Sequence, residues 1–331
     1  MAEIVITKDK GNKALSNPLF SIIIVNTNEG KYILNCIQSI QDKIDAKRCP
    51  YEIIVSDNGS VDGSVEAIRE RFPWVKVIEN NTKYGFGKAN NIGAKQAKGE
   101  VLFFLNPDTV IVDGIEEMVE YILRNREVGV INPLIVDEHD EFGNIYDNYK
   151  ISSYLIVQFI NLIYPKPFYL RWNSEHREKV NKMDVFRIER FYGCAFLIRR
   201  QLFKDIGCFD DKIFIYSEED DITFRLKKIK YSCYCYPKSK IIHFGLQKNA
   251  GQNKYSFIVC NKRMLVSKRY LLKKYFPYTW VLRYLLDIGI IIRALITSTI
   301  KTIIMREHKD YDIIRNNIEK LKLAFLTLID K

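Results

Sequence analysis

The sequence lacks several features that mark well-known protein classes. No stretch reaches 18 uncharged apolar residues, so we predict no membrane-spanning helix. The first 20 residues are polar and hold no apolar signal core, so we do not expect export. The seven cysteines are scattered, and the closest pair, Cys233 and Cys235, lacks zinc-site spacing. The scattered cysteines indicate reduced thiols, and with the missing signal core they predict a cytoplasmic protein. The sequence also has no internal repeat and no low-complexity segment.

Composition and charge describe a folded protein with a basic end. The 331 residues are 47% hydrophobic and 27% charged, which excludes wholesale disorder and suits one large domain, alone or with appendages. The formal net charge is +11, and it is unevenly spread. Residues 261–331 hold 15 Lys and Arg against 6 Asp and Glu, a net of +9. An anionic surface, either a membrane or a nucleic acid, is therefore a candidate partner.

The first 135 residues alternate between short apolar runs and segments with helical spacing. This alternation predicts an α/β protein with a mostly parallel sheet flanked by helices. The predicted strands are 20–26, 51–57, 75–80 and 100–106, and the predicted helices are 30–41, 61–72, 85–98 and 114–125. Residues 134–187 show no clear period and are expected to form an irregular insertion.

Polar residues stand where four of these strands end. They are Asn26, Asp57, Asn80 and Asp108. Ligands of open α/β sheets bind beyond the carboxyl ends of the strands. We therefore expect these four side chains to share one pocket.

Six stretches occur in an order typical of one enzyme family. They are IIIVNTN, IIVSDNGSVDGS, YGFGKANNIGAKQAKGEVLFFLNPDT, GCAFLIRR, FDDKIFIYSEEDDITFRL and IIHFG. On these motifs the chain resembles the inverting nucleotide-sugar glycosyltransferases of family 2, especially their rhamnosyltransferase-like branch. The resemblance implies a glycosyltransferase A-type fold. It divides the chain into a leader (1–19), a catalytic domain (20–252) that includes the insertion, and a basic amphipathic helical region (253–331).

A metal site is expected after the strand that ends in NPDT. A sugar leaving a nucleoside diphosphate releases a doubly charged group, which a divalent cation neutralises. Mg²⁺ or Mn²⁺ prefers oxygen ligands, and Asp108, presented by the turn at Pro107, is placed to supply one. The family's motif is often Asp-x-Asp, whereas Asn106 occupies the first position here. The resemblance adds His243 as a further ligand or as a neighbour of the diphosphate.

The nucleotide is expected at the ends of the first two strands. The resemblance implies that Asp57 accepts the imide hydrogen of a uracil or thymine base. Thr27 and Asn28 would line the same pocket. The alternative for Asp57 is a plain turn-forming aspartate.

A glycine-containing helix start is expected near the phosphates. Gly85 and Gly87 lack Gly-x-Gly-x-x-Gly spacing and do not follow the first strand, so they are no dinucleotide fingerprint. We expect Gly85 to bring the helix start, with its phosphate-binding N–H groups, close to the ligand. Lys88 and Asn91 would then face the nucleotide.

A general base is expected in the acidic stretch YSEEDD. Crowded carboxylates raise one another's pKa, which suits a base, although acidic first turns also stabilise helices. The resemblance assigns the base to Glu219, with Glu218 and Asp221 as supporting acids and Asp221 holding the helix. Gly193 would allow close approach of the donor sugar or the acceptor.

Three function classes fit these residues. The first is an inverting glycosyltransferase that moves a sugar from a UDP- or dTDP-sugar to a hydroxyl of a lipid-linked cell-surface glycan. The second is a sugar nucleotidyltransferase, which would need a Gly-rich, Arg-bearing loop where NTNEGKYILN stands. The third is a catalytically silent binding protein or a nucleic-acid binder. The joint presence of Asp57, Asp108 and the acidic stretch favours the first, so we expect no nucleic-acid partner.

The apolar segment from 276 to 305 is interrupted by charges. Arg283, Asp287, Arg293 and Lys301, together with Thr297, fall within an arc of about 120° on a helix. Such a helix either packs on its own domain or lies in a membrane interface. The basic surroundings favour the membrane, because each Lys or Arg near an anionic leaflet contributes about 1 kcal/mol. We therefore expect attachment to the inner face of the cell membrane.

Overall fold

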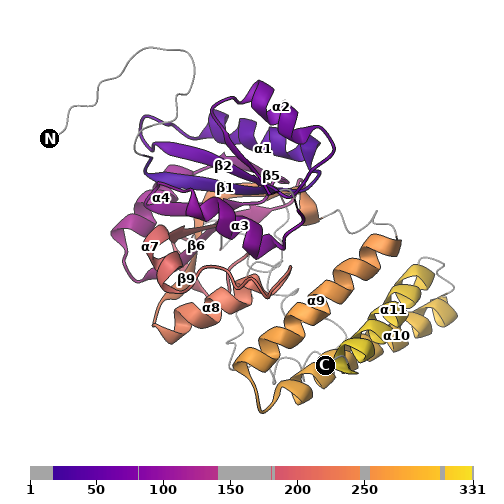
Figure 1. Ribbon diagram of the computed structural model, residues 1–331. Coiled ribbons are helices and arrows are strands. Elements are labelled where there is room, and N and C mark those ends of the chain that lie inside the picture. Colours follow the sequence, from indigo (N-terminus) through magenta and orange to yellow (C-terminus); the bar gives the residue numbers. More distant parts are fainter. Residues whose placement is uncertain are drawn as a thin grey trace.

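The first half of the fold is a parallel α/β unit. The computed structural model describes residues 18–80, 82–140, 180, 183–246, 254–305 and 310–329. Four parallel strands lie side by side in the order β3-β2-β1-β4. Helices α1 and α2 cover one face of the sheet and α3 covers the other (Figure 1). The elements are β1 (Phe20–Asn26), α1 (Gly30–Lys43), β2 (Tyr51–Asp57), α2 (Ser64–Arg71), β3 (Lys76–Glu79), α3 (Phe86–Lys95) and β4 (Val101–Leu105).

The second half of the sheet is largely antiparallel. The full order is β3-β2-β1-β4-β8-β6-β9-β5, with β7 paired to β9. Four of the eight pairings among the described strands are parallel and four antiparallel, so the α/β sheet is mixed rather than mostly parallel. The elements are β5 (Thr109–Asp113), α4 (Ile115–Arg124), β6 (Val128–Val136), β7 (Phe186–Ile188), β8 (Ala195–Arg199), α7 (Arg200–Asp205), α8 (Glu218–Lys228) and β9 (Ser232–His243), followed by the 3-10 turn η2 (Phe244–Leu246).

The sheet's interior is mostly apolar. All five side chains of β4 are buried, as the run VLFFL predicts for a central strand covered on both faces. An aromatic cluster fills the α3 side, where Phe104 stacks on Phe196 at 5.0 Å and meets Phe209 edge-on at 5.2 Å. This packing holds β4 and β8 rigidly together. The residues that follow β4 and precede β8 are thereby positioned beside each other.

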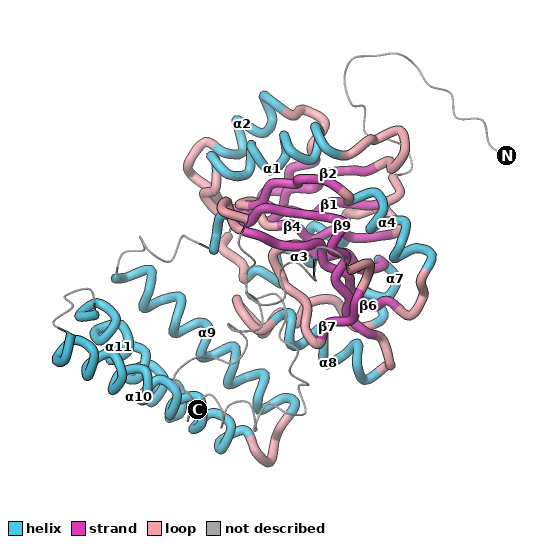
Figure 2. The backbone as a smooth tube through the Cα atoms, turned by 180° about the vertical axis from the view of Figure 1, so that it is seen from behind, coloured by secondary structure: helices cyan, strands magenta, loops and turns pink. Residues whose placement is uncertain are grey.

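The C-terminal region forms three helices, as the sequence predicts. They are α9 (Lys254–Tyr275), α10 (Trp280–Met305) and α11 (Asp310–Ile329). In Figures 1 and 2, α9 lies between the sheet domain and the pair α10–α11. A second, smaller core joins the three helices around Leu272, Tyr284, Ile288 and Ala324. Of the leader only residues 18–19 are described, and of the insertion (134–187) only residues 134–140, 180 and 183–187.

Two of the charges predicted to form a stripe on α10 face inward. Arg283 and Asp287 are 7% and 8% exposed. Asp287 pairs with Lys268 of α9 at 2.8 Å, and the Arg283 guanidinium lies 3.7 Å from the centre of the Phe276 ring. The intramolecular alternative therefore holds for this part of the stripe. The side chains of Thr297 and Lys301 lie outside the described residues.

Candidate active site

The ends of β1 and β2 form one hydrogen-bonded unit, as expected for neighbouring parallel strands. Asn26 lies opposite Asp57 in the sheet, and its side-chain amide donates to Asp57 Oδ1 at 2.8 Å. Asp57 Oδ2 accepts the backbone N–H groups of Gly59 and Ser60 at 3.0 and 2.9 Å. The carboxylate is 1% exposed and shapes the turn, which is the alternative role named for it. Its contact with a nucleobase stays a prediction.

The two residues after β1 are exposed at the same edge. Thr27 and Asn28 both lie at the surface. Asn28 adopts a left-handed backbone with φ of 56°, and its Oδ1 accepts the backbone N–H of Val61 at 2.8 Å. Its own N–H donates to Ser60 Oγ at 2.9 Å. The strand-end loop is thus tied to the turn after β2, which leaves Thr27 as the exposed side chain beside it.

The glycines before and within α3 leave room for the segment that precedes α8. A Cβ on Gly85 would lie 2.2 Å from the Phe214 carbonyl oxygen, and a Cβ on Gly87 would lie 2.8 Å from Phe209 Cβ. The Asn91 amide donates to the Phe209 carbonyl at 2.9 Å and its oxygen accepts the Phe209 N–H at 3.0 Å. The close approach at Gly85 is made to the loop before α8, and a contact of this helix start with a phosphate stays a prediction.

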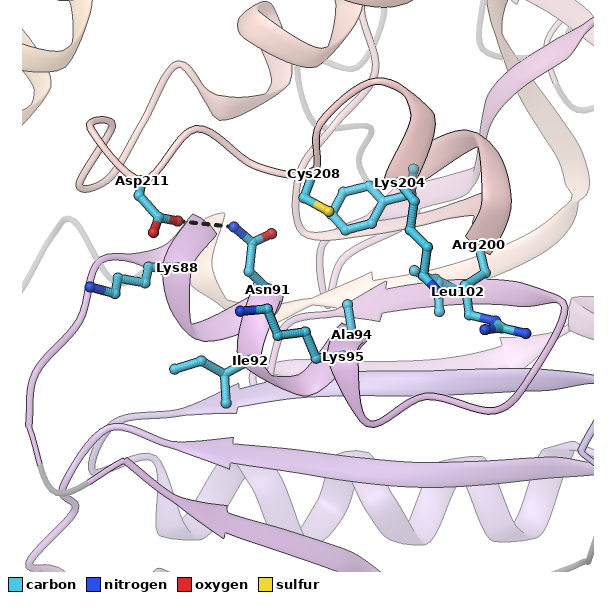
Figure 3. Close-up of a pocket in the computed structure, with 11 residues that line it drawn as sticks. Lys88, Asn91, Ile92, Ala94, Lys95, Leu102, Arg200, Lys204, Cys208 and Asp211 are labelled. Atoms are coloured by element: carbon cyan, nitrogen blue, oxygen red, sulfur yellow. Dashed lines mark hydrogen bonds between the residues drawn. The ribbon is translucent and has the colours of Figure 1, made fainter.

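Lys88 and Asn91 line a cavity on the face of the sheet (Figure 3). The cavity measures about 330 Å³ and lies between α3 and α7, with Arg200, Lys204 and Leu102 in its wall. Leu102 is near the start of β4, so this cavity is separated along the strand from the edge where β4 ends. Lys88 also rests over the Tyr84 ring, with its Nζ 4.4 Å from the ring centre. A nucleotide contact of Lys88 or Asn91 stays a prediction.

Asp108 and His243 meet at the predicted edge. Strand β5, which the sequence pattern did not reveal, pairs Thr109 with His243. As a result Asp108 Oδ1 lies 3.3 Å from His243 Nε2, with both side chains close to 90% buried. The Phe244 N–H donates to the Asp108 carbonyl at 2.9 Å and fixes the turn. Burial disfavours the imidazolium, but Cys194 and Asp108 outweigh it and raise the pKa of His243 to about 10.

Gly245 lies against the Asp108–His243 pair, and the sequence reasoning did not single it out. A Cβ on Gly245 would lie 2.5 Å from Asp108 Oδ2 and 2.8 Å from His243 Nε2. Only a glycine leaves the space in front of this pair open. The glycine two residues after the histidine, in the motif IIHFG, was the available signal.

The segment 193–194 connects the Asp108 turn to the acidic helix. The Asn106 N–H donates to the Cys194 carbonyl at 2.8 Å. On the other side, a Cβ on Gly193 would lie 2.8 Å from Glu219 Oε1. Buried Asn132 anchors the segment by donating to the Tyr192 and Ala195 carbonyls. Asn132 was not singled out in the sequence, where it looks like any polar residue after a strand.

The acidic helix α8 begins with carboxylates that differ in environment. Glu218 is 4% exposed, whereas the Glu219 side chain is 21% exposed. Arg190 lies 2.8 Å from Asp220 and 3.9 Å from Glu219. Ser217, the residue before the helix, makes no side-chain cap. The acidic turn therefore combines helix stabilisation with a partial positive counter-charge from Arg190, a residue that the sequence reasoning missed.

Burial raises the pKa of both glutamates. For Glu218, burial is the main cause and the charge of Glu219 adds to it. For Glu219, burial again dominates, while Arg190 opposes the rise. Neither the Glu218 Oε1 nor the Glu219 Oε2 atom makes a hydrogen bond within the described structure. A carboxylate with a raised pKa and an oxygen that makes no hydrogen bond is suited to accept a proton.

Asp221 plays a structural part within the acidic stretch. Its side chain is fully buried and pairs with Arg225 one turn later on α8. Lys274 Nζ and the Tyr275 hydroxyl, both from α9, donate to Asp221 Oδ1 at 2.6 and 2.7 Å. The Phe224 ring stacks on Tyr275 with ring centres 4.2 Å apart. Asp221 thus joins the helical region to the helix that carries Glu219.

A comparison with protein families decides the class of the chain. The family model described as glycosyl transferase family 2 matches residues 21–207, which is more than half of the sequence. The chain belongs to glycosyltransferase family 2. Four of the six motifs named from the sequence fall within this match, and the other two follow it at 209–226 and 241–245.

Relatives of this family 2 chain include several named transferases. An N-acetylglucosaminyl-diphospho-decaprenol L-rhamnosyltransferase of Mycobacterium tuberculosis is 26% identical over 59% of this chain and 66% of its own length. An N-acetylgalactosaminyltransferase 7 of Drosophila melanogaster is 24% identical over 82% of this chain and 48% of its own. The matches thus span less than two thirds of these relatives. The first relative agrees with the rhamnosyltransferase-like branch expected from the motifs.

Solved structures show the same fold. A mannosyltransferase of Pyrobaculum calidifontis, in complex with GDP-Man and Mn²⁺, superimposes with a TM-score of 0.56 at 14% identity, covering 96% of this chain and 89% of its own. GalNAc-T7 with UDP, GalNAc and Mn²⁺ gives a TM-score of 0.53 at 21% identity, covering 69% of this chain and 44% of its own. These likenesses establish the glycosyltransferase A-type fold of this family 2 member.

Proposed function

We propose that this family 2 chain is an inverting glycosyltransferase that moves a sugar from a UDP- or dTDP-sugar to a hydroxyl of a lipid-linked glycan. The observation that carries the proposal is the segment 193–194. Cys194 is hydrogen-bonded to the turn that presents Asp108, and Gly193 abuts Glu219. The proposed leaving-group site and the proposed base site therefore lie on either side of residues 193–194. Displacement at a sugar carbon requires the leaving group and the base to be held on opposite sides of that carbon.

The Asp108–His243 pair fits a divalent cation. It offers a carboxylate and the His243 ring 3.3 Å apart, and a bound cation would displace the proton that the raised pKa keeps on this ring. Within the described residues there is no group of three His, Cys, Asp or Glu side chains able to hold a metal. The pair would hold Mg²⁺ or Mn²⁺ together with oxygens of the donor diphosphate, and the Asn106 amide would assist by coordination or hydrogen bonding. When bound, the cation would neutralise the leaving diphosphate.

Glu219 is assigned as the general base. It borders Gly193, its side chain is more exposed than that of Glu218, and its pKa is raised by burial. It can thus take the proton of an acceptor hydroxyl that enters beside Gly193. Asp221 holds the helix, and Arg190 moderates its negative charge. A sugar nucleotidyltransferase or a silent binding protein has no use for a carboxylate with a raised pKa at this place.

The donor and acceptor classes rest on the relatives and on the strand ends. Asp57, Thr27 and Asn28 lie at the edge where the base of the nucleotide would bind. The relative from Mycobacterium tuberculosis is named for a lipid-linked diphosphosugar acceptor and for rhamnose transfer. That name supports a lipid-linked acceptor here, and the pyrimidine base rests on the family resemblance at Asp57.

The test is a metal-dependent donor assay with matched nucleotides. UDP- and dTDP-sugars should be hydrolysed or transferred with Mg²⁺ or Mn²⁺ and spared after EDTA. UDP or dTDP at 100 times its dissociation constant should stabilise the folded protein by about 2.7 kcal/mol, and GDP should not. Stabilisation by GDP alone would overturn the pyrimidine assignment. Turnover that persists undiminished after EDTA treatment would overturn the role of the cation.

A further inference from the structure

Helix α10 presents its charged and apolar side chains in an unusual way. Arg283 and Asp287 are buried against α9, as described above. The solvent side of the same helix is aliphatic instead. Five side chains on it are between 37% and 53% exposed, namely Val281, Leu285, Ile292, Ile296 and Ile300. A surface helix of a soluble domain turns its charged side outward, whereas α10 exposes its aliphatic side.

These five residues form one continuous band, named here the outer stripe. Their spacing of four, seven, four and four residues keeps them on a single face of a helix. At the α-helical rise the outer stripe is about 29 Å long. Leu282, which is 54% exposed, widens the stripe at its start. Scattered exposed leucines are normal on proteins, but a contiguous aliphatic band of this length marks an interaction surface.

The outer stripe lies on the part of the molecule remote from the sheet. Figures 1 and 2 both show α9 between the sheet domain and the pair α10–α11. Helix α11 adds exposed apolar groups at Ile318, Phe325 and Leu326. Buried contacts of α10 face the second core through Tyr284 and Ile288. The catalytic domain therefore does not cover the stripe.

Charge and composition indicate what covers it. Residues 261–331 carry a net charge of +9, and Lys273 and Lys322 are exposed within the helical region. An anionic surface complements this charge. Protein interfaces concentrate Trp, Tyr and Arg at their centres, whereas the outer stripe holds only Val, Leu and Ile. Acyl chains accept such side chains without any specific partner group.

We propose that the outer stripe of α10 lies in the headgroup–acyl boundary of an anionic bilayer, parallel to the membrane plane. In the described part of the chain no helix has the length and apolarity needed to cross a bilayer. An in-plane helix is consistent with that finding. Through α9, whose Lys274 and Tyr275 hold Asp221 on α8, the bilayer contact would set the position of the base helix relative to the membrane. Membrane binding does not depend on the proposed chemistry, so either can fail alone.

The experiment is flotation with vesicles of phosphatidylcholine containing 30% phosphatidylglycerol, against vesicles of phosphatidylcholine alone. The full chain should float with the anionic vesicles at low salt and bind the neutral ones more weakly. The double variant Ile292→Glu/Ile296→Glu should lose binding by about tenfold or more, because it places two carboxylates in the boundary. Ile229→Glu is the matched control, since Ile229 is 46% exposed on the catalytic domain, and it should bind like the wild type.

Two further measurements keep the proposal open to refutation. Wild-type hydrogen exchange should slow in residues 280–305 when anionic vesicles are added and stay unchanged in α3, a result that needs no variant to fold. Light scattering of the wild type and the double variant shows whether a second copy covers the stripe. A dimer that the glutamates dissociate, together with absent flotation, would overturn the proposal. So would equal flotation by the double variant and the control, or unchanged exchange in 280–305.

Discussion

The hydroxyl of Tyr275 offers a sharp test of how the helical region is fastened to the catalytic domain. It donates to Asp221 Oδ1 at 2.7 Å, and the Asp221 side chain is fully buried. Tyr275→Phe removes this hydrogen bond but keeps the ring that stacks on Phe224 at 4.2 Å. A hydrogen bond to a charged group contributes about 1.5–3 kcal/mol, and the remaining donors, Lys274 and Arg225, still neutralise the carboxylate. We therefore expect the free energy of unfolding to fall by about 1.5–3 kcal/mol.

The control is another tyrosine of the same connection. Tyr278 is 99% exposed, so Tyr278→Phe should change the free energy of unfolding by less than about 0.5 kcal/mol. Urea unfolding followed by circular dichroism measures both variants, and the slope of each transition shows whether unfolding stays cooperative. If the two variants unfold at the same urea concentration, the Tyr275–Asp221 bond does not fasten α9 to α8. A separate loss of helical circular dichroism at lower urea concentration, seen in Tyr275→Phe alone, would support the reasoning.

Four other predictions concern the chemistry. Glu219→Gln should bind UDP or dTDP normally but lower kcat by about 10²–10⁴-fold, and a larger loss in Glu218→Gln would move the base by one residue. Because burial raises the pKa of Glu219, the wild-type kcat should fall on acidification through a pKa above the ordinary 4.5, since the base acts deprotonated. Asp108→Ala should abolish EDTA-sensitive transfer with an unchanged circular dichroism spectrum, and unchanged turnover at saturating Mn²⁺ would refute the assignment. Gly193→Ala, whose Cβ would lie 2.8 Å from Glu219 Oε1, should lower kcat by about tenfold without weakening nucleotide binding, whereas an unaffected kcat would argue against Glu219 as base.

The fold was predictable where neighbours in the sheet are also neighbours in the chain. Strands β1 to β4 are apolar runs separated by amphipathic helices, and each pattern is local. Strand β5 follows β4 after only three residues and pairs with β9, more than 120 residues later. No local pattern reports such a pairing. The antiparallel half of the sheet depends on contacts of this kind, which explains why a mostly parallel sheet was expected.

In the candidate site, too, the residue types could be predicted from the sequence, whereas the contacts between them could not. Asp108 and His243 were named from their motifs, but their 3.3 Å approach depends on the β5–β9 pairing. The demand for glycine at position 85 was visible, whereas its cause, the Phe214 backbone more than 120 residues later, was not. The importance of Gly245 arises only once Asp108 and His243 are brought together. Motifs therefore identify chemistry-bearing residues, and long-range pairing determines which of them act together.

Helix α10 shows why amphipathicity alone does not tell which side of a helix is inside. The sequence predicts a charged arc and an apolar remainder, and it is equally compatible with either side facing the protein. Burial of Asp287 becomes possible because Lys268 of α9 lies 2.8 Å away, and burial of Arg283 because the Phe276 ring lies beneath it. With the charges satisfied inside, the aliphatic side is left without a protein partner in the described structure. A helix of this kind gains by burying its outer face elsewhere, and an anionic bilayer supplies both the apolar depth and the negative charge that complements the basic residues of 261–331.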